Sequence, residues 1–457
     1  MFKKHKEIIA IISSFFILKF LTIGFYNNLW WDPAVYIGMG KYIHSFGQSG
    51  LLEPSRPLVW PLVLGFLWKA KLDVVFFGRI LEIIISAGCI LLTYLICEKI
   101  FSKRVAVISS ILLAFSSTFF YFSGMMLSEI TSTFFALAAI YYFMEHEHFL
   151  CGIFFGMAFM TRFLQILPMI AFIAILLLMK KINSKNTTRI FLGFSAVLVP
   201  YLILNTYLYN NPLFPFLEQL DISKNSGWPN FHGIDFYFKN LYKENLFYFL
   251  AFLPVFFIFK DKERIGTKLS IYSSFMVPFL FFNIISQKEM RFLLIIFPFM
   301  FMLIAYSIDE ILKVRFFTQK NLFLIIIITC MIAFSGYHIY NLYRFQDDNQ
   351  YNGLEQYLMQ IKHEKVWISN PIIAARSDLR IDNLMYYPYF SKERKKEMME
   401  SIQNADYIFL DSCDLACRPR DFNCEQDRTE LIDFFGRNFR TDLKEEVNNC
   451  WQYVFKR

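Results

Sequence analysis

The segment that decides the fold runs from Glu7 to Leu29 and reads EIIAIISSFFILKFLTIGFYNNL, followed by Trp30-Trp31-Asp32-Pro33. After Glu7 its single charged residue is Lys19, so the segment is long and apolar enough to cross about 30 Å of hydrocarbon as a helix. The tryptophans that follow are typical of a membrane interface. The segment lacks a small-residue cleavage site, so we expect a retained span rather than a signal peptide.

The rest of the chain repeats this apolar pattern. Of its 457 residues 56% are hydrophobic and only 18% are charged, whereas about a quarter of an ordinary soluble domain is charged. Apolar stretches of spanning length lie near 74–97, 105–122, 130–146, 148–162, 164–180, 190–208, 244–259, 269–286, 292–311 and 322–342. The sequence therefore predicts an α-helical polytopic membrane protein with about eleven transmembrane helices over residues 1–345.

The charges indicate the orientation of these spans. Lys and Arg cluster in short connectors such as 99–104, 180–189 and 260–268, which fall on the cytoplasmic side if the N-terminus is cytoplasmic. The formal charge of +8 thus reflects cytoplasmic loops, and the sequence predicts a lipid bilayer as partner and no nucleic acid. The connector at 145–148 is not basic, which makes the region 130–162 the least certain part of the count.

The longer connectors fall on the opposite, extracytoplasmic side. An outer loop at 30–73 has the composition of short interfacial helices, and an outer loop at 209–243 reads as a folded or re-entrant segment. From 346 to 457 the composition becomes that of a soluble domain. We expect strands near 365–369, 405–410 and 450–455 and helices near 392–404 and 425–438, hence a small extracytoplasmic α/β domain.

Asp32 is the most informative single residue. Its carboxylate follows the first span in an apolar loop, where partial desolvation favours a catalytic base, although Asp-Pro is also a common helix start. Arg56, between Ser55 and Pro57, either holds a lipid phosphate or makes ordinary headgroup contacts.

Further charged residues occur at span ends. Arg162 lies between two apolar stretches, so its charge needs a partner or a ligand, and Arg79 either shares such a role or snorkels. Glu129 either favours the start of a helix or belongs to the same outer cavity as Asp32.

Lys288, Glu289 and Arg291 form a charged turn between two spans on the same predicted side. The turn is either solvated or a clamp for phosphate.

The cysteines and histidines predict no metal site. Four cysteines of the soluble tail, Cys413, Cys417, Cys424 and Cys450, lack the paired spacing of a zinc site, so two disulfides are the better expectation outside the cell. The seven histidines never share a metal-ligand spacing with carboxylates or thiols on one outer surface.

Taken in order, these motifs resemble the GT-C glycosyltransferases. The stretches 31–36, 56–62 and 77–81 resemble the branch that contains the dolichyl-phosphate-mannose–protein mannosyltransferases and the lipid A aminoarabinose transferase. Ser128-Glu129 looks like the second acidic position of that branch, and 152–162 resembles its Gly-rich span ending in a basic residue. The stretch 287–292 is similar to the His-Lys-Glu segment of the mannosyltransferases that build glycan precursors, with Gln287 in place of the histidine.

The resemblance implies a reaction and its residues. A monosaccharide, such as the hexose mannose, would leave a polyprenyl or dolichyl phosphate for a protein, lipid-linked glycan or lipid acceptor. Asp32 would be the inverting general base and Glu129 an orienting catalytic acid. Tyr36, Arg56, Arg79, Arg162, Lys288, Glu289 and Arg291 would bind substrate. A divalent metal is not required, because these cations can offset the phosphate charge.

A transporter or flippase of lipid-linked sugars is the competing interpretation. Such a protein would show paired, interrupted spans with ionisable groups near the middle of the membrane. Here the charged candidates gather at one predicted face together with the largest loops, which favours an interfacial enzyme.

Overall fold

The structure of the chain is a computed structural model. It describes residues 5–25, 29–225, 232–313 and 319–344 and, in the tail, 357, 361, 365–385, 399–402, 404–415, 417, 422–447 and 450–457. The chain divides into two compact units. The bundle unit comprises residues 1–26, 79–203 and 232–346, and the loop–tail unit comprises 27–78, 204–231 and 347–457.

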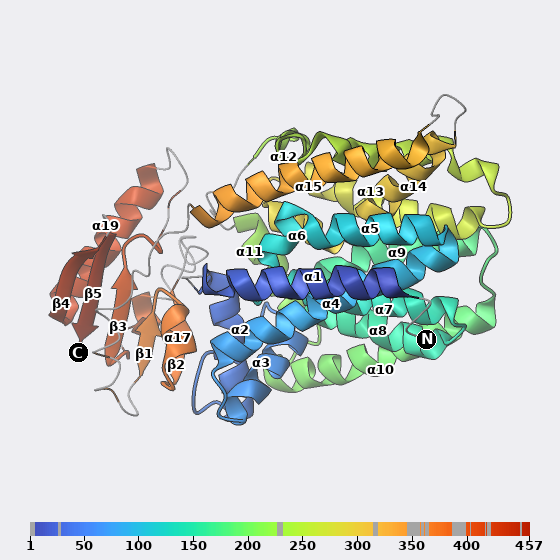
Figure 1. The fold of residues 1–457 in the computed structure, drawn as a ribbon. Coiled ribbons are helices and arrows are strands. Elements are labelled where there is room, and N and C mark those ends of the chain that lie inside the picture. The colour runs from blue at the N-terminus through green and yellow to red at the C-terminus, as the bar shows by residue number, and fades with distance from the viewer. Residues whose placement is uncertain are drawn as a thin grey trace. The chain divides into compact units, whose positions relative to one another are not determined.

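The bundle unit is made of helices (Figure 1). Its α-helices are α1 (Lys6–Thr22), α4 (Val74–Ile100), α5 (Lys103–Phe115), α6 (Ser117–Phe122), α7 (Ser128–Met144), α8 (His148–Thr161), α9 (Ile166–Leu178), α10 (Ser184–Tyr209), α12 (Phe236–Glu244), α13 (Ile265–Ile284), α14 (Phe297–Leu312) and α15 (Lys320–Arg344). Short 3₁₀ segments are η1 (Ile23–Phe25), η2 (Phe163–Gln165), η3 (Leu246–Phe256), η4 (Ile258–Lys260) and η5 (Met290–Ile295). Helices α4 and α10 begin or end in the other unit.

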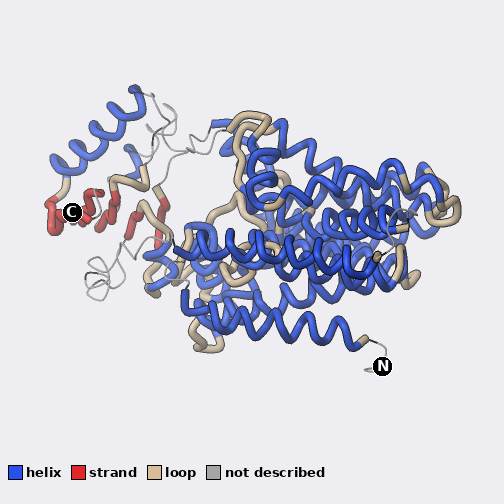
Figure 2. The backbone as a smooth tube through the Cα atoms, turned by 45° about the horizontal axis from the view of Figure 1, so that its top comes forward, coloured by secondary structure: helices blue, strands red, loops and turns tan. Residues whose placement is uncertain are grey.

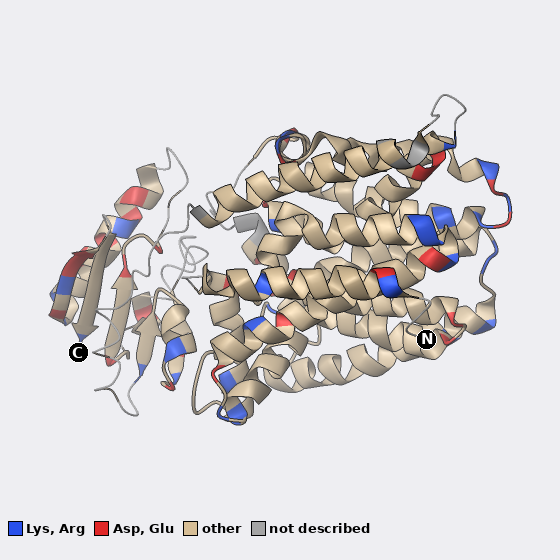
Figure 3. Ribbon diagram, viewed as in Figure 1, with Lys and Arg blue, Asp and Glu red and all other residues tan. Residues whose placement is uncertain are grey.

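The helices are apolar along their length, and charged residues gather mainly near helix ends and in connectors (Figure 3). Within the described residues five helices are long and apolar enough to cross a membrane, or six if the bent pair α12 and η3–η4 forms one span. This is fewer than the about eleven spans expected, because several of the expected stretches are shorter helices or are broken into two pieces. The membrane class is unaffected, since five or six helices of spanning length remain among the described residues.

Buried carboxylates lie at the starts of two helices, one of them at such a break. The expected span 105–122 is divided at Ser116, and Glu244 accepts hydrogen bonds from the Thr118 backbone N–H (3.1 Å) and hydroxyl (2.6 Å) at the start of α6. Likewise Glu82 of α4 accepts a hydrogen bond from the Leu127 N–H (2.9 Å), directly before α7. The first N–H groups of a helix have no partner inside the helix, so a carboxylate there both satisfies donors and favours the dipole.

In the loop–tail unit, the first loop folds as two helices, α2 (Trp31–His44) and α3 (Val59–Lys69). They cross closely at a pair of glycines, since a Cβ on Gly40 would lie 2.5 Å from the Pro61 carbonyl and 2.6 Å from the Gly65 nitrogen. The second long loop contributes α11 (Phe214–Asn225) to the same unit.

The tail forms a five-stranded sheet with helices (Figure 2). Its elements are β1 (Val366–Ile368), α17 (Ile372–Arg376), β2 (Ile381–Leu384), β3 (Tyr407–Asp411), α19 (Phe422–Asn438), β4 (Arg440–Val447) and β5 (Cys450–Lys456). The strand order is β2-β1-β3-β5-β4; β1 pairs in parallel with β2 and β3, and β5 runs antiparallel to β3 and β4. The α/β tail is therefore confirmed. Strands β2 and β4 were not expected, and most of the expected helix 392–404 lies outside the described residues.

A buried lysine joins the first loop to the tail within this unit. Lys41 of α2 is only 4% exposed, and its ammonium donates to the Ala375 and Ser377 carbonyls, both at 2.8 Å, at the end of α17. Asp378 lies 3.3 Å away as a salt-bridge partner, yet burial lowers the pKa of Lys41. The first loop is thus fixed to the tail by specific contacts, and the interfacial position of its helices stays a prediction.

Candidate active site

Asp32 lies in a compact group of charged side chains that we call the first-loop cluster: Asp32, Tyr36, Glu53, Ser55 and Arg56. The Arg56 guanidinium lies 2.7 Å from a carboxylate oxygen of Asp32 and 3.2 Å from one of Glu53. It also donates to the Tyr36 hydroxyl at 3.4 Å and lies over that ring, while Ser55 donates to Glu53 at 3.2 Å. One cation is therefore shared by two carboxylates.

Local sequence explains this geometry. The N-cap of α2 is Trp30, so Asp32 is the second residue of the helix rather than its cap. Residues 32 and 36 lie one turn apart on the same helical face. The segment 51–58 carries Arg56. It is fixed to α2 by a hydrogen bond from the Leu51 N–H to the Gly38 carbonyl (3.2 Å).

A second group, which we call the bundle cluster, lies within the bundle unit: Glu129, Arg162, Glu289 and Arg291. Arg162 and Arg291 lie 3.2 and 3.8 Å from the same oxygen of Glu129, whose side chain is fully buried. Arg291 also binds Glu289 at 2.6 Å. Four residues predicted from three separate motifs are thereby brought together.

Helix ends create the bundle cluster. Glu129 is the second residue of α7, and Arg162 is the extended residue that ends α8 before η2. Arg162 also donates to the Ser128 hydroxyl at 3.2 Å. Both arginines lie over the ring of Phe292, with 5.4 and 5.7 Å to its centroid. An aromatic face beneath two guanidiniums stabilises their positive charge away from water.

Two of the predicted basic residues have other surroundings. Lys288 is 2% exposed, donates to the His232 carbonyl at 3.1 Å and also to that of Ile285, and burial lowers its pKa. Its ammonium thus closes the turn, which favours a structural role over a phosphate clamp. Arg79 lies half-buried on α4, one turn before Glu82, and its substrate-binding role stays a prediction.

Sequence reasoning missed Glu53 and Glu82. Glu53 is 8% exposed and completes the first-loop cluster, yet its position in a Pro-rich segment resembles an ordinary solvated acid. Glu82 is fully buried and lies close enough to Lys19 to interact electrostatically, while Lys19 donates to the Phe120 carbonyl at 2.7 Å. A lone acid within an apolar span was the available signal for Glu82, because such residues are costly without a partner.

The carboxylates of both clusters do not fit a divalent cation in this arrangement. Asp32 and Glu53 share a guanidinium, as do Glu129 and Glu289. A metal would have to displace these arginines to gain the oxygen ligands that hard cations require.

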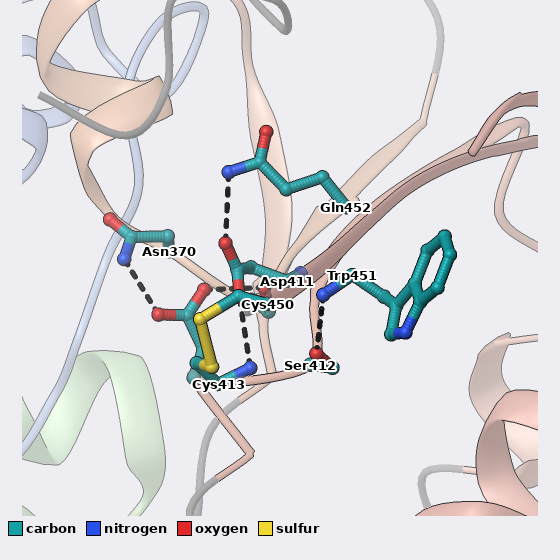
Figure 4. The surroundings of a disulfide bond; sticks show 9 residues. Asn370, Asp411, Ser412, Cys413, Cys450, Trp451 and Gln452 are labelled. Atoms are coloured by element: carbon teal, nitrogen blue, oxygen red, sulfur yellow. Dashed lines mark hydrogen bonds between the residues drawn. A yellow bond between two sulfur atoms is a disulfide. The ribbon is translucent and has the colours of Figure 1, made fainter. Parts of the chain in front are cut away.

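The tail cysteines form two disulfides, Cys413–Cys450 and Cys417–Cys424. Figure 4 shows the first, where Asp411 accepts hydrogen bonds from the Cys413 N–H (2.9 Å) and the Gln452 amide (3.0 Å). Burial raises the pKa of Asp411. Asp411 lies near both sulfurs of this bridge, but sulfurs joined in a disulfide do not serve as thiolate ligands.

Comparison with solved structures identifies the fold as that of the GT-C glycosyltransferases. ArnT from Cupriavidus metallidurans, solved bound to undecaprenyl phosphate, matches with a TM-score of 0.65 and 10% identity over 98% of this chain and 97% of that chain. The archaeal oligosaccharyltransferase AglB from Archaeoglobus fulgidus, in complex with an inhibitory peptide and a dolichol-phosphate, matches with a TM-score of 0.63 and 11% identity over 90% of this chain and 70% of that one.

The family follows from the sequence itself. A sequence model of the Alg9-like mannosyltransferase family matches residues 5–366, and the chain belongs to that family. No curated protein sequence matches the chain. The protein is therefore a membrane glycosyltransferase of the GT-C type, which decides against the transporter interpretation.

Proposed function

We propose that the protein transfers a hexose, such as mannose, from a polyprenyl or dolichyl phosphate to a hydroxyl-bearing extracytoplasmic acceptor. The family supports the mannosyl group. The two structural neighbours, solved with undecaprenyl phosphate and dolichol-phosphate, support the lipid carrier. The first-loop cluster supports the chemistry.

The observation that carries the proposal is the position of Asp32. Asp32 is 9% exposed, and its carboxylate lies 2.7 Å from the Arg56 guanidinium, which fixes its orientation. Asp32 takes the proton of the acceptor hydroxyl as that oxygen bonds to the anomeric carbon. The bond from this carbon to the phosphate oxygen breaks, the lipid phosphate leaves, and the configuration inverts.

Basic residues would offset the charge on the departing phosphate. The resemblance assigns this role to Arg56, Arg162, Lys288 and Arg291. Arg56 belongs to the same unit as Asp32 and lies beside it, whereas Lys288 is directed at backbone carbonyls and is less suited to this role. Guanidiniums held in place before the reaction offset developing charge at little reorganisation cost.

The orientation in the membrane is part of the same proposal. The basic connectors predict a cytoplasmic N-terminus and an extracytoplasmic tail. The two disulfides of the tail support this, because disulfides persist in oxidising compartments.

The test is transfer from a synthetic polyprenyl-phosphate mannose by Asp32→Asn protein in detergent. We expect the rate to fall by about 10²- to 10⁴-fold, the usual contribution of a general base. Asp73→Asn is the matched control, since Asp73 is an exposed residue of the same unit. Full activity of Asp32→Asn protein would refute Asp32 as the base.

A further inference from the structure

The buried lysine that joins the first loop to the tail has no role in the reaction proposed above. Lys41 of α2 is 4% exposed, and its ammonium donates to the Ala375 and Ser377 carbonyls at the end of α17. The last carbonyls of a helix have no partner inside the helix, so the ammonium satisfies groups that would otherwise need water. A buried charge is costly unless it is paired, and Asp378 supplies a third acceptor at 3.3 Å. The position of Lys41 is therefore closely defined.

Asp378 extends this contact to the second helix of the first loop. Its carboxylate also accepts a 3.0 Å hydrogen bond from the indole N–H of Trp68 on α3. Helices α2 and α3 in turn cross closely at Gly40 and Gly65. One residue of the tail thus binds both helices of the first loop. We call the contacts of Lys41 and Trp68 with the end of α17 and Asp378 the tail contact.

Close backbone packing surrounds the tail contact. A Cβ on Gly38 of α2 would lie 3.3 Å from the Cβ of Ala374 in α17. The Gly50 N–H donates to the Leu379 carbonyl and the Ile381 N–H donates to the Gly50 carbonyl, both at 2.8 Å. All of these residues belong to the loop–tail unit. Packing of this density transmits a displacement rather than absorbing it, so α2 follows the position of α17.

Asp32 and Lys41 lie on opposite faces of α2. They are nine residues apart, which corresponds to about two and a half helical turns. The separation along the helix axis is about 14 Å, so a tilt of about 4° around Lys41 would move Asp32 by about 1 Å. A displacement of that size at a catalytic group lowers the rate by about 100-fold. Arg56 thus holds Asp32 from one side, while the tail contact holds the helix from the other.

We propose that Lys41 is a positioning residue for Asp32. By fixing one face of α2 to the tail, it keeps the carboxylate on the opposite face in the orientation that takes the proton of the acceptor hydroxyl. The inference rests on the proposed function and makes the tail a part of the catalytic machinery rather than an attached domain.

The first experiment compares four full-length proteins: the wild type, Asp32→Asn, Lys41→Met and the double variant. Transfer from synthetic polyprenyl-phosphate mannose to a synthetic lipid-linked oligosaccharide is measured in detergent. We expect Lys41→Met to lower kcat by about 10- to 100-fold with the donor KM unchanged, because the misplaced group reacts but does not bind the donor. In the Asp32→Asn protein the same change should have little further effect, since no base is left to be positioned.

Two further variants separate positioning from folding. Asp378→Ala removes the acceptor shared by Lys41 and Trp68, and this side chain is 72% exposed, so we expect the variant to fold. Its kcat should fall several-fold, the usual size of one lost hydrogen bond or ion pair. Lys69→Met, at an exposed basic residue of α3 in the same unit, is the matched control and should have normal kcat.

The second experiment does not depend on transfer. Hydrogen exchange of the purified full chain is followed by mass spectrometry over residues 31–44, which form α2. We expect exchange about tenfold faster in Lys41→Met protein and unchanged in Lys69→Met protein, because α2 opens more easily without the tail contact.

The outcomes distinguish this inference from the proposed function. Normal kcat of both Lys41→Met and Asp378→Ala proteins, or an equal loss from Lys41→Met with and without the Asp32 carboxylate, overturns the positioning role and leaves Asp32 as the base. Full activity of Asp32→Asn protein refutes the base and, with it, the positioning role. Unchanged exchange over α2 in Lys41→Met protein overturns the tail contact as a support of α2, whatever transfer is measured.

Discussion

The first-loop cluster and the bundle cluster use the same residue types in opposite ways. In the first, a single guanidinium, Arg56, is shared by the carboxylates of Asp32 and Glu53. In the second, the single buried carboxylate of Glu129 is shared by Arg162 and Arg291. The first cluster has a carboxylate in excess, whereas the second holds two guanidiniums around Glu129 and pairs one of them with Glu289 as well.

The two arrangements suit their carboxylates to different roles: proton transfer in the first-loop cluster and the holding of guanidiniums in the bundle cluster. Asp32 retains some exposure at 9%, so an acceptor hydroxyl can reach its carboxylate, whereas Glu129 is fully buried. A buried carboxylate with two cations at hand is better suited to holding guanidiniums for an anion than to accepting a proton itself. The predictions below test this contrast.

The largest expected effect is on the stability of the bundle unit. Arg162→Met leaves the Glu129 carboxylate buried with only the more distant Arg291, and breaking a buried pair in this way costs about 3–5 kcal/mol. Thermal unfolding in detergent measures it. The double variant with Glu129→Gln should recover part of the loss, and equal stability of the single and double variants would contradict the pairing.

The next effect is on activity through the first-loop cluster. Arg56→Lys keeps the charge but removes the planar fork that holds Asp32 and Glu53 together, so Asp32 loses its fixed orientation. We expect kcat to fall by about 10- to 100-fold, with thermal unfolding little changed, since one misplaced catalytic group has effects of this order. Lys69→Arg, at an exposed basic residue of α3, is the control and should have normal kcat.

The next prediction concerns the close packing of α2, which carries Asp32, against α3. Gly40→Ala places a methyl group 2.5 Å from the Pro61 carbonyl, and overpacking of this kind costs about 1–3 kcal/mol. Because Asp32 begins the same helix, we also expect reduced activity. Gly436→Ala is the control, since nothing lies within 4 Å of its Cβ. Equal melting of both variants and the wild type would argue against the close helix crossing.

The smallest expected effect is that of Tyr36→Phe. The substitution removes a hydroxyl that accepts a 3.4 Å hydrogen bond from Arg56 but keeps the ring beneath the guanidinium. We expect a loss of about 0.5–1.5 kcal/mol, seen as a several-fold lower kcat/KM. A loss as large as that of Asp32→Asn would mean that Tyr36 itself takes part in proton transfer.

Much of the fold could be predicted from the sequence because it depends on local composition. Long apolar stretches must form helices in a bilayer, and the change of composition near residue 346 marks a soluble tail. The number of full-length spans could not be predicted. Breaks such as the one at Ser116 depend on Glu244, a carboxylate more than a hundred residues away that satisfies the N–H groups of a new helix start.

The residues of the candidate site likewise divide into those that the sequence predicts and those that it does not. Asp32, Arg56, Glu129, Arg162 and Arg291 were predicted because charged residues beside apolar spans are costly and therefore conspicuous. Glu53 was missed because an acid in a loop has no such cost until the tertiary structure buries it. Lys288 looked like a phosphate ligand, but its direction toward two carbonyls depends on how the turn folds.

The segment from Glu7 to Pro33 shows both what the sequence determines and what depends on the tertiary structure. By itself the sequence determined a membrane span followed by an interfacial acid, since hydrophobicity and length are properties of consecutive residues. Only the tertiary structure decided that this acid shares Arg56 with Glu53 and that its helix is tied to the tail through Lys41. The hydrogen bonds of Lys41 join residues up to 336 positions apart, and no local pattern in the sequence encodes them.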